Sequence, residues 1–207
     1  GHNDYDWGGS QDWGGYYGIL RNNQLVYDRA VELDYEFHQG VALVMKSLVF
    51  GLITDRWGDA PYSTALKGEL GGGENIKPAY DSQEDIYTGI LADLETANTL
   101  LSKDKEAYSS IVDNVDVYYN GDPAKWRKLA NSLMLRYYMR ISAKKPDIAK
   151  AGIEKIVANA AQYPIITSNG DDATMAFPGT SNDTSWPANT VYDASGSNYR
   201  RIKMANT

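Results

Sequence analysis

Cysteine is absent from this chain of 207 residues, and histidine occurs only at His2 and His38. Without cysteine the chain can form no disulfide, no zinc–thiolate centre and no cysteine nucleophile. Two histidines are too few for a multi-histidine metal site. We therefore expect no resident metal ion, and nothing else in the sequence calls for a cofactor.

Long apolar runs and basic clusters are also scarce. The longest apolar-rich stretch, residues 41–53, is interrupted by Lys46, whereas a membrane span needs roughly 20 apolar residues. Acidic residues outnumber basic ones by 27 to 20. The one basic cluster, between Lys125 and Arg140, lies in a single helical pattern, and we interpret it as a solvated face. Because nucleic-acid-binding proteins usually carry a basic face, the composition predicts neither a transmembrane helix nor a nucleic-acid partner.

The signatures of common hydrolases are missing. Neither Ser63 nor Ser132 stands in the Gly-x-Ser-x-Gly setting of a serine nucleophile. The carboxylates of Asp55 and Asp59 could form the acid pair of a glycosidase. The interpretation we favour is a turn at the end of a helix, with a local ion pair between Arg56 and one of the flanking aspartates. We therefore expect a protein without catalytic residues.

Three other patterns fall short of ligand-binding motifs. Asp113, Asp116 and Asp122 lack the alternating acidic positions and closing glutamate of an EF-hand, and Asp122 is explained as a helix N-cap. The glycines at 71–73 lack the Gly-x4-Gly-Lys-Ser/Thr spacing of a phosphate loop. His38 has no second histidine beside it, so we interpret it as a structural residue.

Hydrophobic periodicity predicts four substantial helices joined by loops. Ser82 and the Asp122-Pro123 pair are typical helix starts. The expected helices span residues 26–53, 83–101, 123–141 and 146–162. Residues 1–18 are predicted as loop, with room for a short helix after Gly15. Residues 164–207 are predicted to be rich in loops, with short strands near Ile165 and Met175.

This pattern predicts a mainly α fold, either a helical bundle or an α-solenoid with long irregular loops. We treat residues 1–207 as one region, with a helical scaffold at about 16–163 and a loop-rich segment at 164–207. The common tetratricopeptide consensus is absent, so periodicity alone predicts no repeat. A loop segment of this length is unusual on a compact domain. With the missing initiator methionine, it indicates a piece of a longer protein.

The chain is rich in aromatic residues, with 5 Trp, 16 Tyr and 3 Phe. A flat ring covers the C–H face of a sugar, while neighbouring polar groups bond its hydroxyls. We interpret Trp126, on a helical apolar stripe, as core. Aromatic and polar residues in the loops are better candidates for ligand contact. The residues predicted to bind ligand are Trp7, Trp13, Trp186, Tyr192, Asn189 and Arg200. The alternative is that these rings only pin the loops onto the helices.

Three segments, in order and in register, carry a family resemblance. They are residues 52–63 (LITDRWGDAPYS), 78–87 (PAYDSQEDIY) and 116–133 (DVYYNGDPAKWRKLANSL). Together they resemble SusD/RagB-like proteins, in particular the branch whose helix begins with Tyr-x-Gly-Asp-x-x-Lys-Trp. The resemblance covers about residues 13–163. Family members are much longer and begin with a lipid-attached cysteine that this sequence lacks.

The resemblance implies a function that the residues alone do not. It implies tetratricopeptide-like helix pairs in an outer-membrane lipoprotein on the bacterial surface, attached only through an N-terminal lipid. Such a protein captures glycans, or sometimes peptides, and passes them to a SusC-type TonB-dependent transporter without catalysis. The alternatives are a helical adaptor that binds only protein, and a helical glycoside hydrolase.

Overall fold

The computed structural model describes residues 13–179 and 184, and the chain divides into two compact units, residues 1–172 and 173–207. The first unit holds all the helices and strands of the described residues. In the second, the backbone N–H of Gly179 donates a hydrogen bond to the carbonyl of Thr184 at 3.0 Å.

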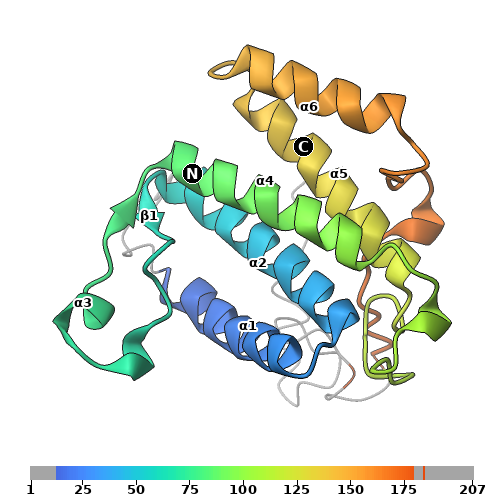
Figure 1. Cartoon of the computed structure of the whole chain (residues 1–207), viewed down its shortest axis with the longest axis horizontal. Coiled ribbons are helices and arrows are strands. Elements are labelled where there is room, and N and C mark those ends of the chain that lie inside the picture. Colours follow the sequence, from blue (N-terminus) through green and yellow to red (C-terminus); the bar gives the residue numbers. More distant parts are fainter. Residues whose placement is uncertain (1–12, 180–183, 185–207) are drawn as a thin grey trace, which may run out of the picture. The chain divides into compact units, whose positions relative to one another are not determined.

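The first unit is a stack of five long helices with short elements between them (Figure 1). The long helices are α1 (Gly14–Glu32), α2 (Glu36–Trp57), α4 (Gln83–Leu100), α5 (Pro123–Ile141) and α6 (Pro146–Ala158). The short elements are β1 (Ala60–Pro61), α3 (Gly73–Ile76), β2 (Tyr80–Asp81) and three 3-10 turns, Gly68–Leu70, Lys105–Ala107 and Asn169–Asp171. The prediction of a mainly α fold is confirmed.

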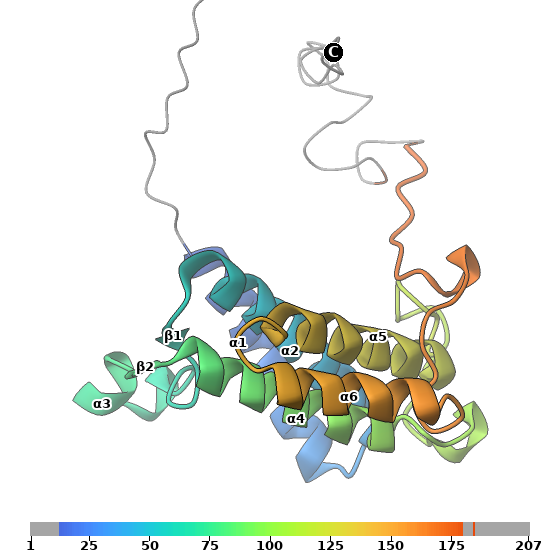
Figure 2. The same cartoon turned by 90° about the horizontal axis from the view of Figure 1, so that it is seen from above.

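The long helices pack in succession. Helix α2 packs against both α1 and α4, α4 packs against α5, and α5 packs against α6. Figure 1 shows this succession, and Figure 2 shows α5 and α6 lying over the other helices when the unit is seen from above. Because each helix covers an apolar face of its neighbour, the core runs through the stack. Its largest fully buried side chains include Phe50, Ile53, Ile86 and Leu94.

Helices α1 and α2 correct the prediction of one helix over residues 26–53. The chain turns between them at Asp34, whose φ of 55° lies in the left-handed region, and Tyr35 N–H donates to the Ala30 carbonyl at 2.8 Å. Helix α1 begins at Gly14, close to the short helix expected after Gly15, and is longer than expected because Leu20 is fully buried and Tyr17 packs against the core. Tertiary packing therefore overrides the low helix propensity of the local glycines.

The predicted starts of α4 and α5 are confirmed. The Ser82 hydroxyl accepts a hydrogen bond from Asp85 N–H at 3.1 Å. Asp122 caps α5 by accepting from the N–H groups of Ala124 (2.9 Å) and Lys125 (3.2 Å). Both caps satisfy backbone donors that an uncapped helix would leave without partners.

Helix α2 packs against three other helices, α1, α4 and α5. Among the described residues it alone is long and apolar enough to cross a membrane by length and composition, but 61% of its most apolar window is buried inside the protein. It extends beyond the apolar stretch 41–53 at both ends. Gly51 on this helix lets the Tyr137 side chain of α5 approach so closely that an added Cβ would lie 2.2 Å from the phenolic oxygen. The apolarity of α2 is therefore that of a core helix.

The strands expected near Ile165 and Met175 are wrong, since the described residues there form none. Side chains of α5 hold the backbone after α6 instead. Asn131 donates to the Pro164 carbonyl at 2.9 Å, and Ser132 accepts from Ile166 N–H at 2.9 Å. These side chains satisfy backbone groups that a strand partner would otherwise take up.

The basic residues of α5 also bind this segment, which corrects their interpretation as a solvated face. Lys125 donates to the Gly170 carbonyl at 2.9 Å, and Lys128 forms an ion pair with Asp171 at 2.8 Å. The Arg127 guanidinium reaches the Gln162 carbonyl at 2.7 Å. The cluster therefore fixes residues 162–171 against α5.

Candidate functional site

Aromatic rings from three elements gather where α1 begins and α2 ends. We call Trp13, Tyr16, Arg56, Trp57 and Tyr80 the terminal aromatic patch. The ring centroid of Trp13 lies 5.8 Å from that of Trp57 and 5.9 Å from that of Tyr80. Tyr16 contacts Trp57 edge to face at 5.7 Å, and the Arg56 guanidinium lies 5.6 Å from the Tyr16 ring centroid.

The short β1–β2 pairing brings Tyr80 to the end of α2. Helix α2 stops at Gly58, whose φ is 74°, and β1 follows at once. Strand β2 pairs antiparallel with it, so that Pro61 lies opposite Tyr80. The Tyr17 hydroxyl donates to the Pro61 carbonyl at 2.6 Å and so ties this turn to α1. Trp13 and Tyr80, which lie far apart in the sequence, thus share one surface.

A carboxylate fixes the base of the loop between the two strands. Asp81 accepts hydrogen bonds from Tyr62 N–H (2.9 Å), Ser63 N–H (2.9 Å) and the Ser63 hydroxyl (2.6 Å). Partial burial alone would raise the pKa of Asp81, but these hydrogen bonds outweigh it and lower the pKa below its usual range. Burial raises the pKa of Tyr17 to about 12. At neutral pH, Asp81 is therefore ionised and Tyr17 keeps the proton it donates.

The terminal aromatic patch has the chemistry of a sugar-binding surface. Tyr80 is 63% exposed, whereas Trp13 and Trp57 are half-buried and hold their rings in place. An exposed ring supported by packed rings offers a flat apolar face at little cost in conformational entropy. The Arg56 guanidinium, which is exposed, adds hydrogen-bond donors beside that face.

The structure describes one of the six residues predicted to bind ligand. Trp13 lies in the terminal aromatic patch, where it both packs and borders the surface. The others, Trp7, Trp186, Tyr192, Asn189 and Arg200, lie outside the described residues, and their roles stay predictions.

Sequence reasoning missed the contributions of Tyr80 and Arg56. The β pairing that places Tyr80 spans only two residues on each strand, too few to leave an alternating pattern. The closeness of Tyr80 to Trp57, at the end of α2, was therefore not readable from the sequence.

The expected local Asp–Arg pair is wrong, because within the described residues neither Asp55 nor Asp59 forms an ion pair with Arg56. Asp55 forms an ion pair with Arg140 of α5 at 3.0 Å and accepts a 2.5 Å hydrogen bond from the Tyr87 hydroxyl of α4. Asp59 accepts from Gln83 N–H at 2.9 Å. The two carboxylates thus act in helix packing and capping, and Arg56 is left to stack on aromatic rings.

The remaining acidic and histidine candidates have structural partners as well. Asp116 accepts hydrogen bonds from Trp126 Nε1 at 2.6 Å and from Gly121 N–H at 3.0 Å. Within the described ranges, no group of three or more His, Asp or Glu residues is placed to hold a metal ion. His38 Nδ1 lies 3.1 Å from the Ser110 hydroxyl, and burial lowers the histidine pKa.

Comparison with known proteins agrees with this architecture. The sequence matches the SusD-like family, described as starch-binding and associating with the outer membrane, over residues 2–206. Three solved structures are similar. An outer membrane protein of Bacteroides vulgatus described in connection with nutrient binding is 33% identical, with a TM-score of 0.72. A SusD homologue of Bacteroides fragilis is 30% identical, with a TM-score of 0.70. A chitin-binding SusD homologue of Flavobacterium johnsoniae is 31% identical, with a TM-score of 0.64.

These matches cover most of this chain but only part of each relative. The alignments span 87%, 84% and 84% of the chain, and 37%, 36% and 36% of the three structures. A search of curated proteins gives no match. Because the family match runs over almost the whole sequence, and the helical stack is shared at 30% identity or more, this chain belongs to the SusD-like family.

Proposed function

We propose that the chain is part of a cell-surface protein that binds poly- or oligosaccharides without cleaving them. The observation that carries the proposal is the terminal aromatic patch of this chain. The description of the family as starch-binding supports it. A structural relative named as a chitin-binding SusD homologue supports it. The engagement of Asp55 and Asp59 in packing and capping supports binding over hydrolysis.

Capture would work by equilibrium binding. A sugar ring lies with its C–H face on Tyr80, and the Arg56 guanidinium bonds hydroxyl groups at the edge. Because such a surface is shallow, it buries little ligand area, so affinity is modest and release is fast. Fast release suits a protein that passes its ligand onward.

The hand-over partner in this proposal is a SusC-type TonB-dependent transporter of the outer membrane. The family description, association with the outer membrane, supports the location. The complete protein would be a lipoprotein facing the exterior, held by an N-terminal lipid. A helical adaptor that binds only protein remains the rival, and it predicts no saccharide affinity.

Calorimetry against chitin oligosaccharides and a panel of polysaccharides, with reducing-end release assayed in parallel, tests the proposal. Saturable binding without release of reducing ends supports capture. Release of reducing ends would show hydrolysis and contradict capture without cleavage. Absence of binding by both the chain and the complete protein would favour the adaptor.

A substitution locates the site. Tyr80→Ala should weaken binding about three- to tenfold, since one aromatic contact contributes about 0.5–1.5 kcal/mol. Tyr80 is largely exposed, so folding should be unaffected. Tyr35→Ala is the matched control, because Tyr35 is an exposed tyrosine at the opposite ends of α1 and α2. Equal binding by both variants would remove the terminal aromatic patch from the proposal.

A further inference from the structure

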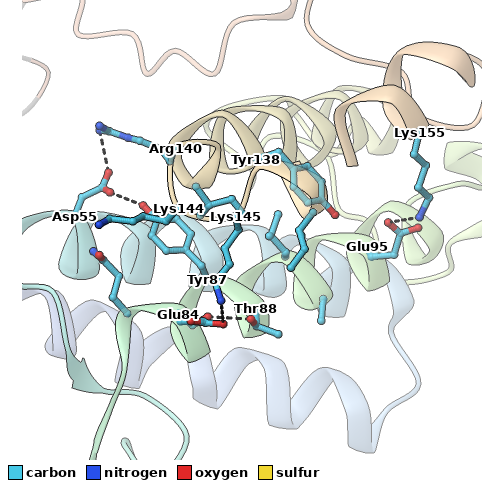
Figure 3. Close-up of a pocket in the computed structure, with 15 residues that line it drawn as sticks. Asp55, Glu84, Tyr87, Thr88, Glu95, Tyr138, Arg140, Lys144, Lys145 and Lys155 are labelled. Carbon is cyan, nitrogen blue, oxygen red and sulfur yellow. Dashed lines mark hydrogen bonds and ion pairs between the residues drawn. The ribbon is translucent and has the colours of Figure 1, made fainter. Parts of the chain in front are cut away.

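A concave surface, separate from the terminal aromatic patch, lies between α4, α5 and α6. It encloses about 800 Å³, which is in the range of small-molecule sites. Figure 3 shows side chains from the three helices converging on it. We call it the α4–α6 groove.

Ion pairs between α4 and the α6 region limit the groove at two points. Glu84 pairs with Lys145 at 2.5 Å, and Glu95 pairs with Lys155 at 3.0 Å (Figure 3). The two glutamates are eleven residues apart on α4, which corresponds to about 16 Å along the helix. The groove therefore has a limited length and accepts a compact ligand more readily than a long helical segment.

The floor of the groove is apolar. Leu91 of α4, Ile141 of α5 and Ile148 of α6 line it together with Tyr138. The Tyr138 ring lies directly on Gly152 of α6, where an added Cβ would come within 2.3 Å of it. The aromatic ring is thus held in position, and its face is supported from α6.

The charges around the groove are unbalanced. Four cationic side chains, Arg140, Lys144, Lys145 and Lys155, line it against three anionic ones. Each anion is paired with one cation. Within the part of the chain that the structure describes, the Lys144 ammonium has no ion pair or hydrogen bond, and neither does the Tyr138 hydroxyl. The groove therefore has a surplus positive charge, in a chain whose net charge is −7.

These features favour an acidic sugar over a peptide. The walls are helices, whose backbone groups are bonded internally, so the groove offers no open strand edge for an extended peptide. It offers instead an apolar floor for a ring face, a phenol for a hydroxyl and an unpaired ammonium for a carboxylate. We propose that the α4–α6 groove binds a saccharide that carries a carboxylate, of the hexuronic acid class. The sugar part of this inference rests on the proposed function.

Calorimetry with trigalacturonate and with its fully methyl-esterified form tests the inference on the 207-residue chain. The ester has the same rings but no negative charge. The acid should bind about tenfold more tightly than the ester, since a charge-assisted hydrogen bond is lost in the ester. Equal binding of the two, or no binding of the acid, would overturn the inference.

Substitutions place the binding in the groove. Lys144→Gln should weaken trigalacturonate binding about tenfold, while the ester is unaffected. Lys150→Gln is the matched control, because Lys150 is an exposed lysine of α6 that, among the described residues, forms an ion pair only with Glu154 of the same helix, at 3.9 Å. Equal weakening by the two variants would indicate non-specific charge attraction and contradict the site.

Two further measurements separate the alternatives. Tighter binding of an acidic tripeptide than of trigalacturonate would make the groove a peptide site and overturn the sugar assignment. Binding of chitin oligosaccharides by the wild-type chain and by Tyr80→Ala measures the terminal aromatic patch independently of the groove. If the chain binds chitin oligosaccharides but not trigalacturonate, only the inference about the groove is refuted. If neither the chain nor the complete protein binds any saccharide, the proposed function itself is refuted.

Discussion

Replacing Asp116 should destabilise the fold more than its position in a loop would indicate. Its carboxylate accepts hydrogen bonds from the N–H groups of Tyr118 (3.0 Å), Tyr119 (3.3 Å) and Gly121 (3.0 Å), and from the Trp126 indole at 2.6 Å. Trp126 is only 2% exposed, so water cannot replace the lost acceptor. Asp116 therefore connects the loop before α5 to the core.

The magnitude follows from these contacts. A hydrogen bond to a charged group contributes about 1.5–3 kcal/mol, and a backbone bond about 0.5–1.5 kcal/mol. Because part of the carboxylate reaches solvent, we take the low end and expect Asp116→Ala to cost about 2–3 kcal/mol. Asp116→Asn keeps one oxygen, but its amide N–H groups would face the N–H donors of Trp126 and Gly121. It should therefore cost nearly as much as alanine.

Urea unfolding followed by circular dichroism measures the loss. Asp113→Asn is the control, because the Asp113 side chain is 70% exposed and, within residues 13–179, forms an ion pair only with Lys105. It should leave the midpoint unchanged. If Asp116→Asn also leaves the midpoint unchanged, the carboxylate is not the connection that we describe, and the reasoning from its four hydrogen bonds fails.

The same residue predicts acid lability. Burial alone would raise the pKa of Asp116, but the hydrogen bonds from Trp126 and the backbone lower it below its usual range. A carboxylate with a lowered folded pKa contributes stability above its unfolded pKa, about 3.9. That contribution is lost as the pH falls through the folded pKa. The difference in free energy of unfolding between the wild type and Asp116→Asn should therefore decrease below about pH 4.

Two more predictions concern the core and a histidine. Gly51→Ala should destabilise the chain by about 1–3 kcal/mol in thermal unfolding, because Tyr137 occupies the space of the new Cβ. Gly18→Ala, with nothing within 4 Å, should be neutral or stabilising through helix propensity; equal effects would refute the packing argument. Burial lowers the pKa of His38 from 6.5, so the unfolded chain binds more protons and stability should fall as the pH drops below about 6.5. His38→Gln should reduce the dependence of the melting temperature on pH between about pH 7 and pH 5. If that dependence is the same in the variant and the wild type, His38 is not its source.

Local chemistry made part of the fold predictable. Ser82 and Asp122 stand at helix starts because short polar side chains cap backbone donors within three residues, and that signal is written in consecutive positions. The apolar stripes of α4 and α5 also follow the helical period within one continuous segment each, so they are visible in the sequence. The mainly α architecture was therefore readable from sequence.

Features set by distant contacts were not readable. Nothing in the local sequence shows that Tyr17 bonds the Pro61 carbonyl or that Asp55 pairs with Arg140. The division between α1 and α2 depends on a left-handed residue, Asp34, inside an otherwise continuous apolar pattern. Of the candidate site, Trp13 was predicted for its aromatic chemistry, whereas Tyr80 needed the β pairing to come near it.

The pairing of β1 with β2 has a consequence for how such a protein can vary. Asp81 and the two strands hold both ends of the connection between them, and Tyr62 and Ala65 at its start pack against the helices. Residues 67–77 are largely exposed, so the helices do not depend on the length of that part. Doubling a closed loop costs only about 0.6 kcal/mol in chain entropy. Insertions and replacements there would leave the stack intact while changing what lies beside Tyr80. The fold thus separates a constant frame from a segment free to diversify, and that segment is the natural position for grafting a new specificity.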